Sequence, residues 1–228
     1  MVDLAKQHID IGLFTNNTEA MLAFWQQQVG LAFEETLPLG PGQRQHRHAM
    51  NGSVLKLNSV HDPMREAAQA GYRELRIARA GISSPRELAD PDGNRIVLVP
   101  PGHRGVVGIE VRLAVRDAAA HDRFYGDALG LERAGDATYR CGDSLVSFDE
   151  EPSATEVAHM TARGFRYLTI QVRNVDAEHA GIVARGGAEG RPPLTLGTTA
   201  RISFVRDPDG NWIEISQRAS LTGPLPAG

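Results

Sequence analysis

The chain contains one short phrase twice, and this repeat restricts the folds that it can adopt. The sequence DPDGN occupies residues 90–94 and again 207–211, and a strand-like stretch follows each copy. The proline fixes φ for a turn, the second aspartate can bond the nearby backbone, and the glycine supplies positive φ. After the second copy, Ile213 and Ile215 face one way and Glu214 the other, which predicts a strand with a carboxylate on its polar face. A turn and strand used twice indicates a duplicated fold.

Further repeats divide the chain into four segments of similar pattern. Strand-like alternation at 8–14 and 108–115 precedes, in each case, a helical pattern that ends in glycine and is followed by more strands. The stretches that open the other two segments, 71–78 and 164–170, match one another. The second segment lacks an amphipathic helix. We therefore predict an α+β fold of four βαβββ modules, the second of them shortened.

A proline- and glycine-rich stretch separates the second module from the third. Periodicity stops over residues 100–105, and we place a domain boundary there. We expect an N-terminal domain over residues 1–101 and a C-terminal domain over 105–219, each built from two consecutive modules. The tail, 220–228, is predicted to be unstructured.

Composition sets the broad class of the protein. A chain of 228 residues with 41% hydrophobic and 23% charged residues is long enough for this arrangement. The net charge of -4 gives no basic stripe for nucleic acid. Neither a signal peptide nor an apolar run of the ~18 residues that a membrane span needs is present, so we expect a cytoplasmic protein without membrane contact. Cys141 is the single cysteine, which we expect to be buried and inert.

Two aromatic motifs give the repeat a family resemblance. The motifs FWQQQVGL at 24–31 and FYGDALGL at 124–131, each after a strand, together with the two DPDGN strands, resemble the vicinal oxygen chelate superfamily. That superfamily includes glyoxalase I, extradiol ring-cleaving dioxygenases and bleomycin-resistance proteins. The resemblance implies two cup-shaped glyoxalase-like domains, each a pair of modules. It also implies one divalent metal in a cup, held by residues of the first and last strands. The aromatic pairs themselves are expected to be core.

The resemblance carries these ligand positions onto particular residues. In the C-terminal half they fall on Glu110, Tyr167 and Glu214, where extradiol enzymes would have two histidines and one glutamate. Two carboxylates and a phenol suit Mg²⁺ or Mn²⁺ better than Fe²⁺. If Glu214 is no ligand, it would pair with an arginine such as Arg112. The corresponding positions elsewhere in the chain are Asp10, Lys56, Glu74, Val97 and Ser147.

The N-terminal half is richer in imidazole. A set of His8, His48 and Glu74 would match the nitrogen-plus-carboxylate chemistry of an Fe²⁺ or Zn²⁺ site. A plain two-residue turn at residues 51–52 would point His46 and His48 at the helix, whereas a bulge at the glycine would point them into the cup. Because buried histidines without partners are costly, we favour the bulged register.

The alternative is a polar cup in which His8 bonds Glu74 and Lys56 pairs with Asp10. The other histidines fall in connectors or on helix faces and are expected to be solvated. They are His61, His103, His121, His159 and His179.

The resemblance implies a metal-dependent enzyme that chelates two neighbouring oxygens of a small diol, catechol or hydroxy-carbonyl substrate. An extradiol-type dioxygenase ranks first and a glyoxalase-like lyase or isomerase second. The other class is a non-catalytic protein that binds a flat small molecule, as bleomycin-resistance members do. Whether two chains pair as a homodimer stays open. We expect Fe²⁺, Mn²⁺ or Zn²⁺ held by His8, His48, Glu74 and Glu214, with Lys56, Tyr167 and Glu110 as catalytic groups.

Overall fold

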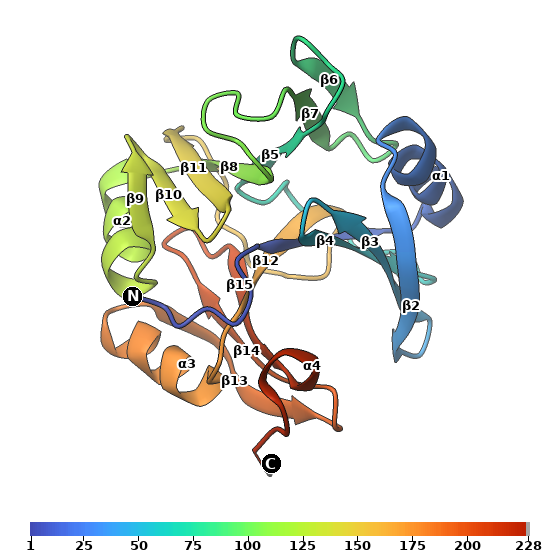
Figure 1. Ribbon diagram of the computed structural model, residues 1–228. Helices are drawn as coiled ribbons and strands as arrows, with labels where there is room; N and C mark the ends of the chain where they lie inside the picture. The colour runs from blue at the N-terminus through green and yellow to red at the C-terminus, as the bar shows by residue number, and fades with distance from the viewer. Residues whose placement is uncertain (227–228) are drawn as a thin grey trace.

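The computed structural model describes residues 1–226, which form four modules in the predicted order (Figure 1). The first and third modules share one plan: a strand, a helix whose last turn is π-helical, and three more strands. The first comprises β1 (Asp10–Thr15), α1 (Thr18–Ala23), η1 (Phe24–Gln28), β2 (Ala32–Gly40), β3 (Gln43–Met50) and β4 (Ser53–Val60). The third comprises β8 (Ile109–Val115), α2 (Ala118–Arg123), η2 (Phe124–Ala128), β9 (Glu132–Gly135), β10 (Thr138–Cys141) and β11 (Ser144–Glu150).

The second module has no helix, as predicted, and the fourth has one that is α-helical throughout. The second comprises β5 (Tyr72–Ala78), β6 (Arg86–Ala89) and β7 (Arg95–Val99). The fourth comprises β12 (Gly164–Gln171), α3 (Val175–Ala184), β13 (Ala188–Leu196), β14 (Ala200–Arg206) and β15 (Trp212–Arg218). The predicted unstructured tail instead starts in a helical turn, α4 (Ala219–Thr222), while residues 227–228 lie outside the described part.

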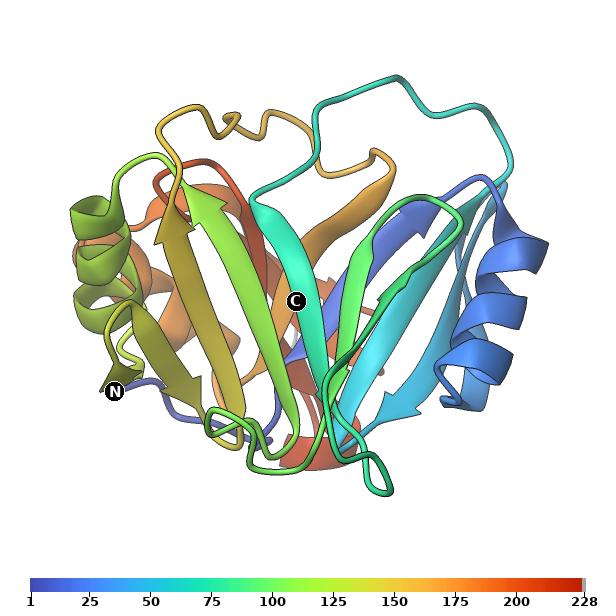
Figure 2. The same cartoon turned by 90° about the horizontal axis from the view of Figure 1, so that it is seen from above.

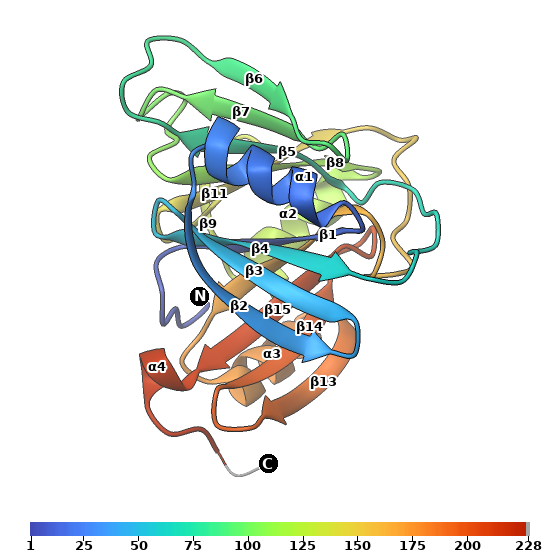
Figure 3. The same cartoon turned by 90° about the vertical axis from the view of Figure 1, so that its right-hand side faces the viewer.

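The modules pair in an order that the sequence did not predict. β1 pairs antiparallel with β12, so module one joins module four, and β5 pairs antiparallel with β8, so module two joins module three. One sheet has the order β13-β14-β15-β12-β1-β4-β3-β2 and the other β6-β7-β5-β8-β11-β10-β9. Figure 3 shows the second sheet stacked above the first. The prediction that consecutive modules share a cup is therefore wrong, because the connector after β7 returns β8 to the free edge of β5.

One continuous hydrophobic cluster contains side chains of both sheets and of the helices. Phe24 and Trp25 of η1 and Phe124 and Tyr125 of η2 are buried in it. Both pairs meet edge to face, with ring centroids 5.4 and 5.2 Å apart, and the equal geometry reflects the repeat. α1 and α2 lie on opposite sides of the molecule (Figure 2). The expected core role of the aromatic pairs is confirmed.

The repeated DPDGN turns link the two sheets. The side-chain oxygen of Asn211 accepts a bond from Gly71 N at 2.8 Å, where module two begins. In the other copy, Asn94 accepts from Phe165 N at 3.3 Å, near the start of module four. The first aspartate of each phrase holds its asparagine in place; for example, Asn211 Nδ2 donates to Asp207 at 2.8 Å. Each turn therefore fastens its own sheet to the opposite one.

The hairpin between β3 and β4 has the plain two-residue register. His46 pairs with Leu57 and His48 with Leu55, and the turn residues Asn51 and Gly52 have φ of 51° and 82°. The bulged register that we favoured is wrong, because the imidazoles find partners on the helix side. Nε2 of His48 lies 3.1 Å from the Gln26 side-chain nitrogen, and His46 bonds Thr36 and Ser59. As a consequence, the residues between them, Gln45 and Arg47, turn into the cup.

Candidate functional site

The eight-stranded sheet carries a cavity of about 470 Å³, which we call the first cup. Its floor comes from the central strands β1, β4, β12 and β15, and its walls come from the hairpins β2–β3 and β13–β14. Modules one and four contribute to it together. Much of the lining is apolar, including Phe14, Leu37, Met160, Ile202 and Phe204.

A buried ion pair forms the floor of the first cup. Lys56 Nζ donates to Glu214 Oε2 at 2.8 Å and to Thr169 Oγ1 at 2.6 Å, and Thr169 Oγ1 donates in turn to Glu214 Oε2 at 2.8 Å. All three residues are buried. The second oxygen of Glu214, Oε1, has no hydrogen-bond partner within residues 1–226. One carboxylate oxygen is thus fixed, and the other is available to a bound molecule.

Tyr167 lies beside this ion pair, with its ring centroid 5.5 Å from Lys56 Nζ. The phenolic oxygen accepts bonds from Asn58 at 3.1 Å and Gln45 at 3.3 Å. Burial, followed by the negative charge of Glu214, raises the pKa of Tyr167 well above its ordinary value. The phenol therefore keeps its proton at neutral pH. The described residues offer no acceptor for that proton, so it can be donated to a ligand.

Gly12 makes room for the tyrosine. It pairs with Lys56 on one side and with Tyr167 on the other. A Cβ at this position would lie 2.1 Å from the Tyr167 ring. The absence of a side chain lets the ring lie against β1, with its hydroxyl at Asn58. Asp10, two residues earlier, bonds Lys6 at 2.7 Å and Val54 N at 2.9 Å. The expected pairing of Lys56 with Asp10 is therefore replaced by the pairing with Glu214.

The seven-stranded sheet has a matching face, the second cup, which is occupied by ion pairs. Arg76 bonds Glu74 at 2.7 Å and Glu110 at 3.0 Å, and Ser147 donates to Glu110 at 2.5 Å. Arg112 lies within 3.8 Å of both glutamates. A small aliphatic cluster packs in the same sheet, made of Ala78, Val97, Val99, Val106 and Leu145. A cavity of about 320 Å³ remains beside Glu74, but arginines neutralise both Glu74 and Glu110.

The four predicted metal ligands do not meet. His8 lies 3.8 Å from Asp143, His48 faces the helix, Glu74 is in the second cup and only Glu214 is in the first. Within residues 1–226, no group of three or more His, Cys, Asp or Glu side chains is placed to hold a metal. The set is wrong for two reasons: the sheet order separates Glu74, and the hairpin register turns His48 away. Of the predicted catalytic groups, Lys56 and Tyr167 come together, and Glu110 does not.

The donors on the floor of the first cup do not suit a divalent metal. They comprise one carboxylate, one phenol that retains its proton and one ammonium group. A divalent cation bound to Glu214 would lie next to the Lys56 ammonium, only 2.8 Å from the same carboxylate, and would be repelled. The position that a metal would need is already taken by a positive charge.

Sequence reasoning missed several residues of the first cup. Thr169 lies two residues after Tyr167, and Asn58 lies two residues after Lys56. Strand alternation, which places such residues on the same face, could have identified both. Gln45 and Arg47 were missed because the wrong hairpin register put them on the helix side. Arg191, on β13, lies in a strand with two register shifts, which hide its orientation in the sequence.

Two of the histidines expected to be solvated are buried instead. His121 lies 3.4 Å from Asp207 Oδ2. Burial lowers the pKa of His121, but the bond and charge of Asp207 outweigh it and raise the pKa overall. His179 lies 2.9 Å from Glu189. Cys141 is buried as expected, and burial raises its pKa to about 12, which makes the thiol inert.

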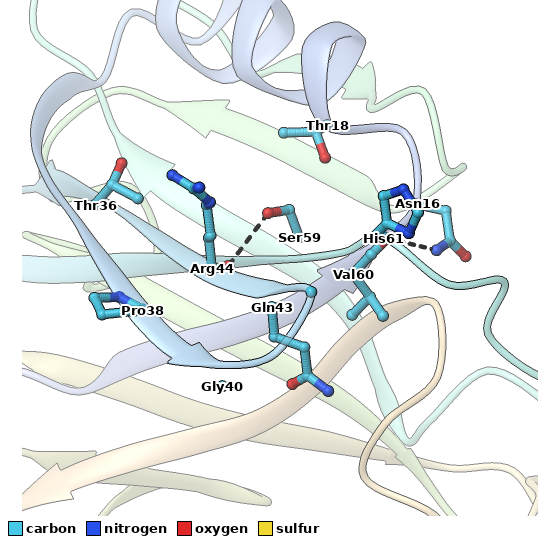
Figure 4. A pocket seen from close by; sticks show the side chains of 11 residues that line it. Asn16, Thr18, Thr36, Pro38, Gly40, Gln43, Arg44, Ser59, Val60 and His61 are labelled. Atoms are coloured by element: carbon cyan, nitrogen blue, oxygen red, sulfur yellow. Dashed lines mark hydrogen bonds between the residues drawn. The ribbon is translucent and has the colours of Figure 1, made fainter.

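A larger hollow, of about 680 Å³, lies elsewhere, between the start of α1 and the strands β2 and β3. Figure 4 shows its short polar side chains, among them Thr18, Thr36 and Ser59. Ser59 there bonds the backbone oxygen of Arg44. No carboxylate lines it within the described residues. It lies beside the hairpin and has no acidic group among the described residues that could act as a base, so the first cup remains the candidate site.

Comparisons with known proteins agree with this architecture. Residues 109–215 match the family model "Glyoxalase/Bleomycin resistance protein/Dioxygenase superfamily". A Synechocystis protein named "Probable lactoylglutathione lyase" is 28% identical over 126 residues, which cover 49% of this chain and 95% of that protein. Glyoxalase I from Zea mays superposes with a TM-score of 0.74 at 14% identity, covering 92% of each chain. Two variants of that plant enzyme superpose with TM-scores of 0.74 and 0.72. The predicted resemblance is confirmed, and the expectation of an enzyme agrees with these relatives.

None of the helices within residues 1–226 is both long enough and apolar enough to cross a membrane.

Proposed function

We propose that this chain, whose residues 109–215 match the glyoxalase/bleomycin resistance protein/dioxygenase superfamily, is an enzyme of that superfamily which moves a proton on a small substrate with neighbouring oxygens. Members of the superfamily generally use a divalent metal ion. In this chain we assign the positive charge of the site to Lys56 instead. The reaction class that we propose is that of a glyoxalase-like lyase or isomerase.

One observation carries the proposal: Lys56, Thr169 and Glu214 form a buried cluster on the floor of the first cup. A charged pair costs desolvation energy where it is buried, and replacing such a pair by apolar residues is often neutral or stabilising. Glu214 Oε1 also remains without a partner among the described residues. A buried pair with one open oxygen, placed in a cleft, favours a chemical role.

We assign a role to each of these side chains. The substrate carbonyl oxygen would accept bonds from the Lys56 ammonium and the Tyr167 phenol. Glu214 Oε1 would then remove the proton from the neighbouring carbon that bears the hydroxyl group. The C–H electrons form a carbon–carbon double bond, and the negative charge develops on the oxygen that Lys56 and Tyr167 hold. Thr169 keeps the Glu214 carboxylate in place by binding its other oxygen.

The second half of the reaction reverses these movements at the adjacent carbon. Protonated Glu214 returns its proton to the former carbonyl carbon, and the hydroxyl proton moves to the oxygen bound there. The carbonyl and hydroxyl groups have then exchanged places, and no atom is gained or lost. We rank this chemistry ahead of ring cleavage, since the histidines that an extradiol-type centre requires lie outside the first cup.

Proton exchange at carbon tests the proposal. We expect the protein to exchange the hydroxyl-bearing C–H of lactoylglutathione, or of small hydroxy-ketones, for deuterium in D₂O, as read by NMR. Glu214→Gln and Lys56→Met should each lower the rate by about 10²-fold or more, the usual contribution of a positioned acid or base. Ser147→Ala, at the equivalent last-strand position in the second cup, should leave the rate unchanged.

Two outcomes would contradict this proposal. Loss of exchange on treatment with a chelator, with recovery on adding a divalent metal, would remove the assigned role of Lys56. Absence of exchange across the whole set of substrates, with the compounds bound and released unchanged, would favour the second candidate. That candidate is a non-catalytic binding protein, and the complete neutralisation of Glu214 by Lys56 is the observation in its favour.

A further inference from the structure

We infer that the first cup selects an anionic substrate, a small molecule with a carboxylate group and an apolar body. This inference rests on the proposed function, because it names the substrate class for the same site. It arises from side chains that the proton-transfer chemistry does not use.

The lining of the first cup is strongly positive. Among residues 1–226 its lining contains Arg47, Lys56, Arg191 and Arg218 and one acidic residue, Glu214. With Glu35, the partner of Arg47, also counted, an excess of two positive charges remains. The whole chain carries a net charge of -4, so this excess is local to the cup. Like charges gathered in one cleft with apolar walls raise the potential there and attract anions.

The arginines of the cup fall into two groups. Arg47, on the β3 wall, lies 3.2 Å from Glu35, just as Lys56 on the floor pairs with Glu214. The other two, Arg191 and Arg218, have no carboxylate within 4.0 Å among residues 1–226. Arg191 instead rests on aromatic rings, with its guanidinium 5.6 Å from the ring centroids of Phe204 and Trp212. Its charge is held in place while its donors stay available.

The second cup provides an internal comparison, because it has the same fold and also contains several arginines. There each of the central arginines is neutralised. Arg76 pairs with Glu74 and Glu110, Arg95 with Glu74 and Glu87, and Arg112 with Glu110 and Asp149. Arg73, at the edge of the second cup, bonds Gln69 instead of a carboxylate. The arginines at the centre of the second cup are thus neutralised, whereas, among the described residues, Arg191 and Arg218 in the first cup are not. A planar guanidinium binds a carboxylate through two parallel bonds, which makes carboxylate the matching ligand group.

The remaining surface of the cup specifies the rest of the ligand. Leu39 and Leu196 line it with 47% and 46% of their surfaces exposed, and Phe204 forms part of its wall. Apolar side chains left open in a cavity of about 470 Å³ favour a ligand with an apolar skeleton. The ligand would place its carboxylate at Arg191 and Arg218 and its oxygenated carbon above Lys56 and Glu214.

A matched pair of small molecules tests this inference. Salicylate and salicylamide share a ring and a hydroxyl group beside the carbonyl, but only salicylate is an anion. We expect calorimetry to show salicylate binding at least about tenfold more tightly, as charge-assisted bonds to guanidinium are the stronger kind. Added NaCl should weaken the binding of salicylate only. The Arg191→Gln/Arg218→Gln variant should bind both compounds equally, and Arg95→Gln, in the second cup, should keep the tenfold ratio.

Equal affinities for the two compounds in the wild-type protein would overturn the inference, and so would absence of binding by both. An equal loss of the ratio in Arg95→Gln would also overturn it, because the effect would then come from net charge alone. Binding is measured without turnover, so failure of the proposed function is seen separately. A tenfold preference for salicylate without any proton exchange would refute the proposed catalysis and support the anion site. Exchange of uncharged substrates, together with equal affinities for salicylate and salicylamide, would support the catalysis and refute the anion site.

Discussion

Gly12 has no chemistry of its own, yet it determines where Tyr167 can lie. The ring occupies the space that a Cβ at position 12 would fill, and its hydroxyl reaches Asn58 and Gln45 only from there. Lys56, Tyr167 and Glu214 could be identified from the sequence because the family resemblance implies ligand positions on the first and last strands of the modules. Their meeting could not be predicted, since Lys56 and Glu214 lie 158 positions apart and share a site only through the pairing of β1 with β12.

The substitution Gly12→Ala should displace Tyr167 and destabilise the fold. The added methyl group would lie 2.1 Å from the ring, and overpacking of this kind costs about 1–3 kcal/mol. Urea unfolding of the variant measures that loss. In the background of Tyr167→Ala the same change should cost clearly less, because the ring is gone. Equal losses in the two backgrounds would show that Tyr167 is not what Gly12 accommodates.

Asp90 should make stability depend on pH. Burial, opposed by bonds from Asn94, raises the pKa of this carboxyl from 3.8 to about 6 in the folded protein. The folded state therefore binds the proton more tightly than the unfolded chain does. The stabilisation is fully present below about pH 4 and is lost as the pH rises through about 6. Two pKa units correspond to about 3 kcal/mol at most.

The measurement compares the unfolding free energies of the wild-type protein and Asp90→Asn in urea between pH 4 and 7. The difference between them, wild type minus variant, should fall across this range. A difference that stays constant with pH would mean that the carboxyl titrates alike in the folded and unfolded chains.

Among the elements, those fixed by local chemistry were predicted well and those fixed by register were not. The strands after DPDGN, the helix-free second module and the aromatic helices follow from turn residues and periodicity. The β3–β4 hairpin was predicted one residue out of register, because both registers satisfy the turn at residues 51–52. The observed register lets His48 bond the side chain of Gln26, and Gln26 lies outside the hairpin.

The DPDGN turn of β15 should contribute to stability through its asparagine. Asn211 is fully buried, and its side chain bonds both Asp207 and the backbone of Gly71. Asn211→Ala would leave a buried N–H without a partner, and we expect a loss of about 1–3 kcal/mol in urea unfolding. Asn94→Ala, in the other copy, should behave alike. An unchanged midpoint in both variants would show that the turns do not fasten the sheets together.

On the scale of the whole molecule, the two sheets interlock the halves of the chain. The repeat predicted four modules and two cups, and both are present. The assignment of one cup to each half failed, since sequence spacing contains no information about which sheet edges meet. The residues of the site predicted for the N-terminal half consequently lie apart, with Glu74 in the second cup and His48 facing the helix. Lys56 and Glu214, which were assigned to different halves, came together.

Neither half should fold alone. Residues 1–101 would expose the edges of β1 and β5, and residues 105–219 those of β12 and β8, while the core requires both halves. We expect each fragment on its own to lack a cooperative thermal transition by circular dichroism, and the two together to recover it. A cooperative transition in a single fragment would restore the domain division that the sequence suggested.

The ion pair at the base of the first cup joins β4, near the beginning of the polypeptide, to β15, near its end. It therefore links module one to module four, in addition to the pairing of β1 with β12. A molecule bound to both Lys56 and Glu214 would stabilise the link between the two modules. Occupancy of the cup should therefore slow the proteolytic trimming of both chain ends.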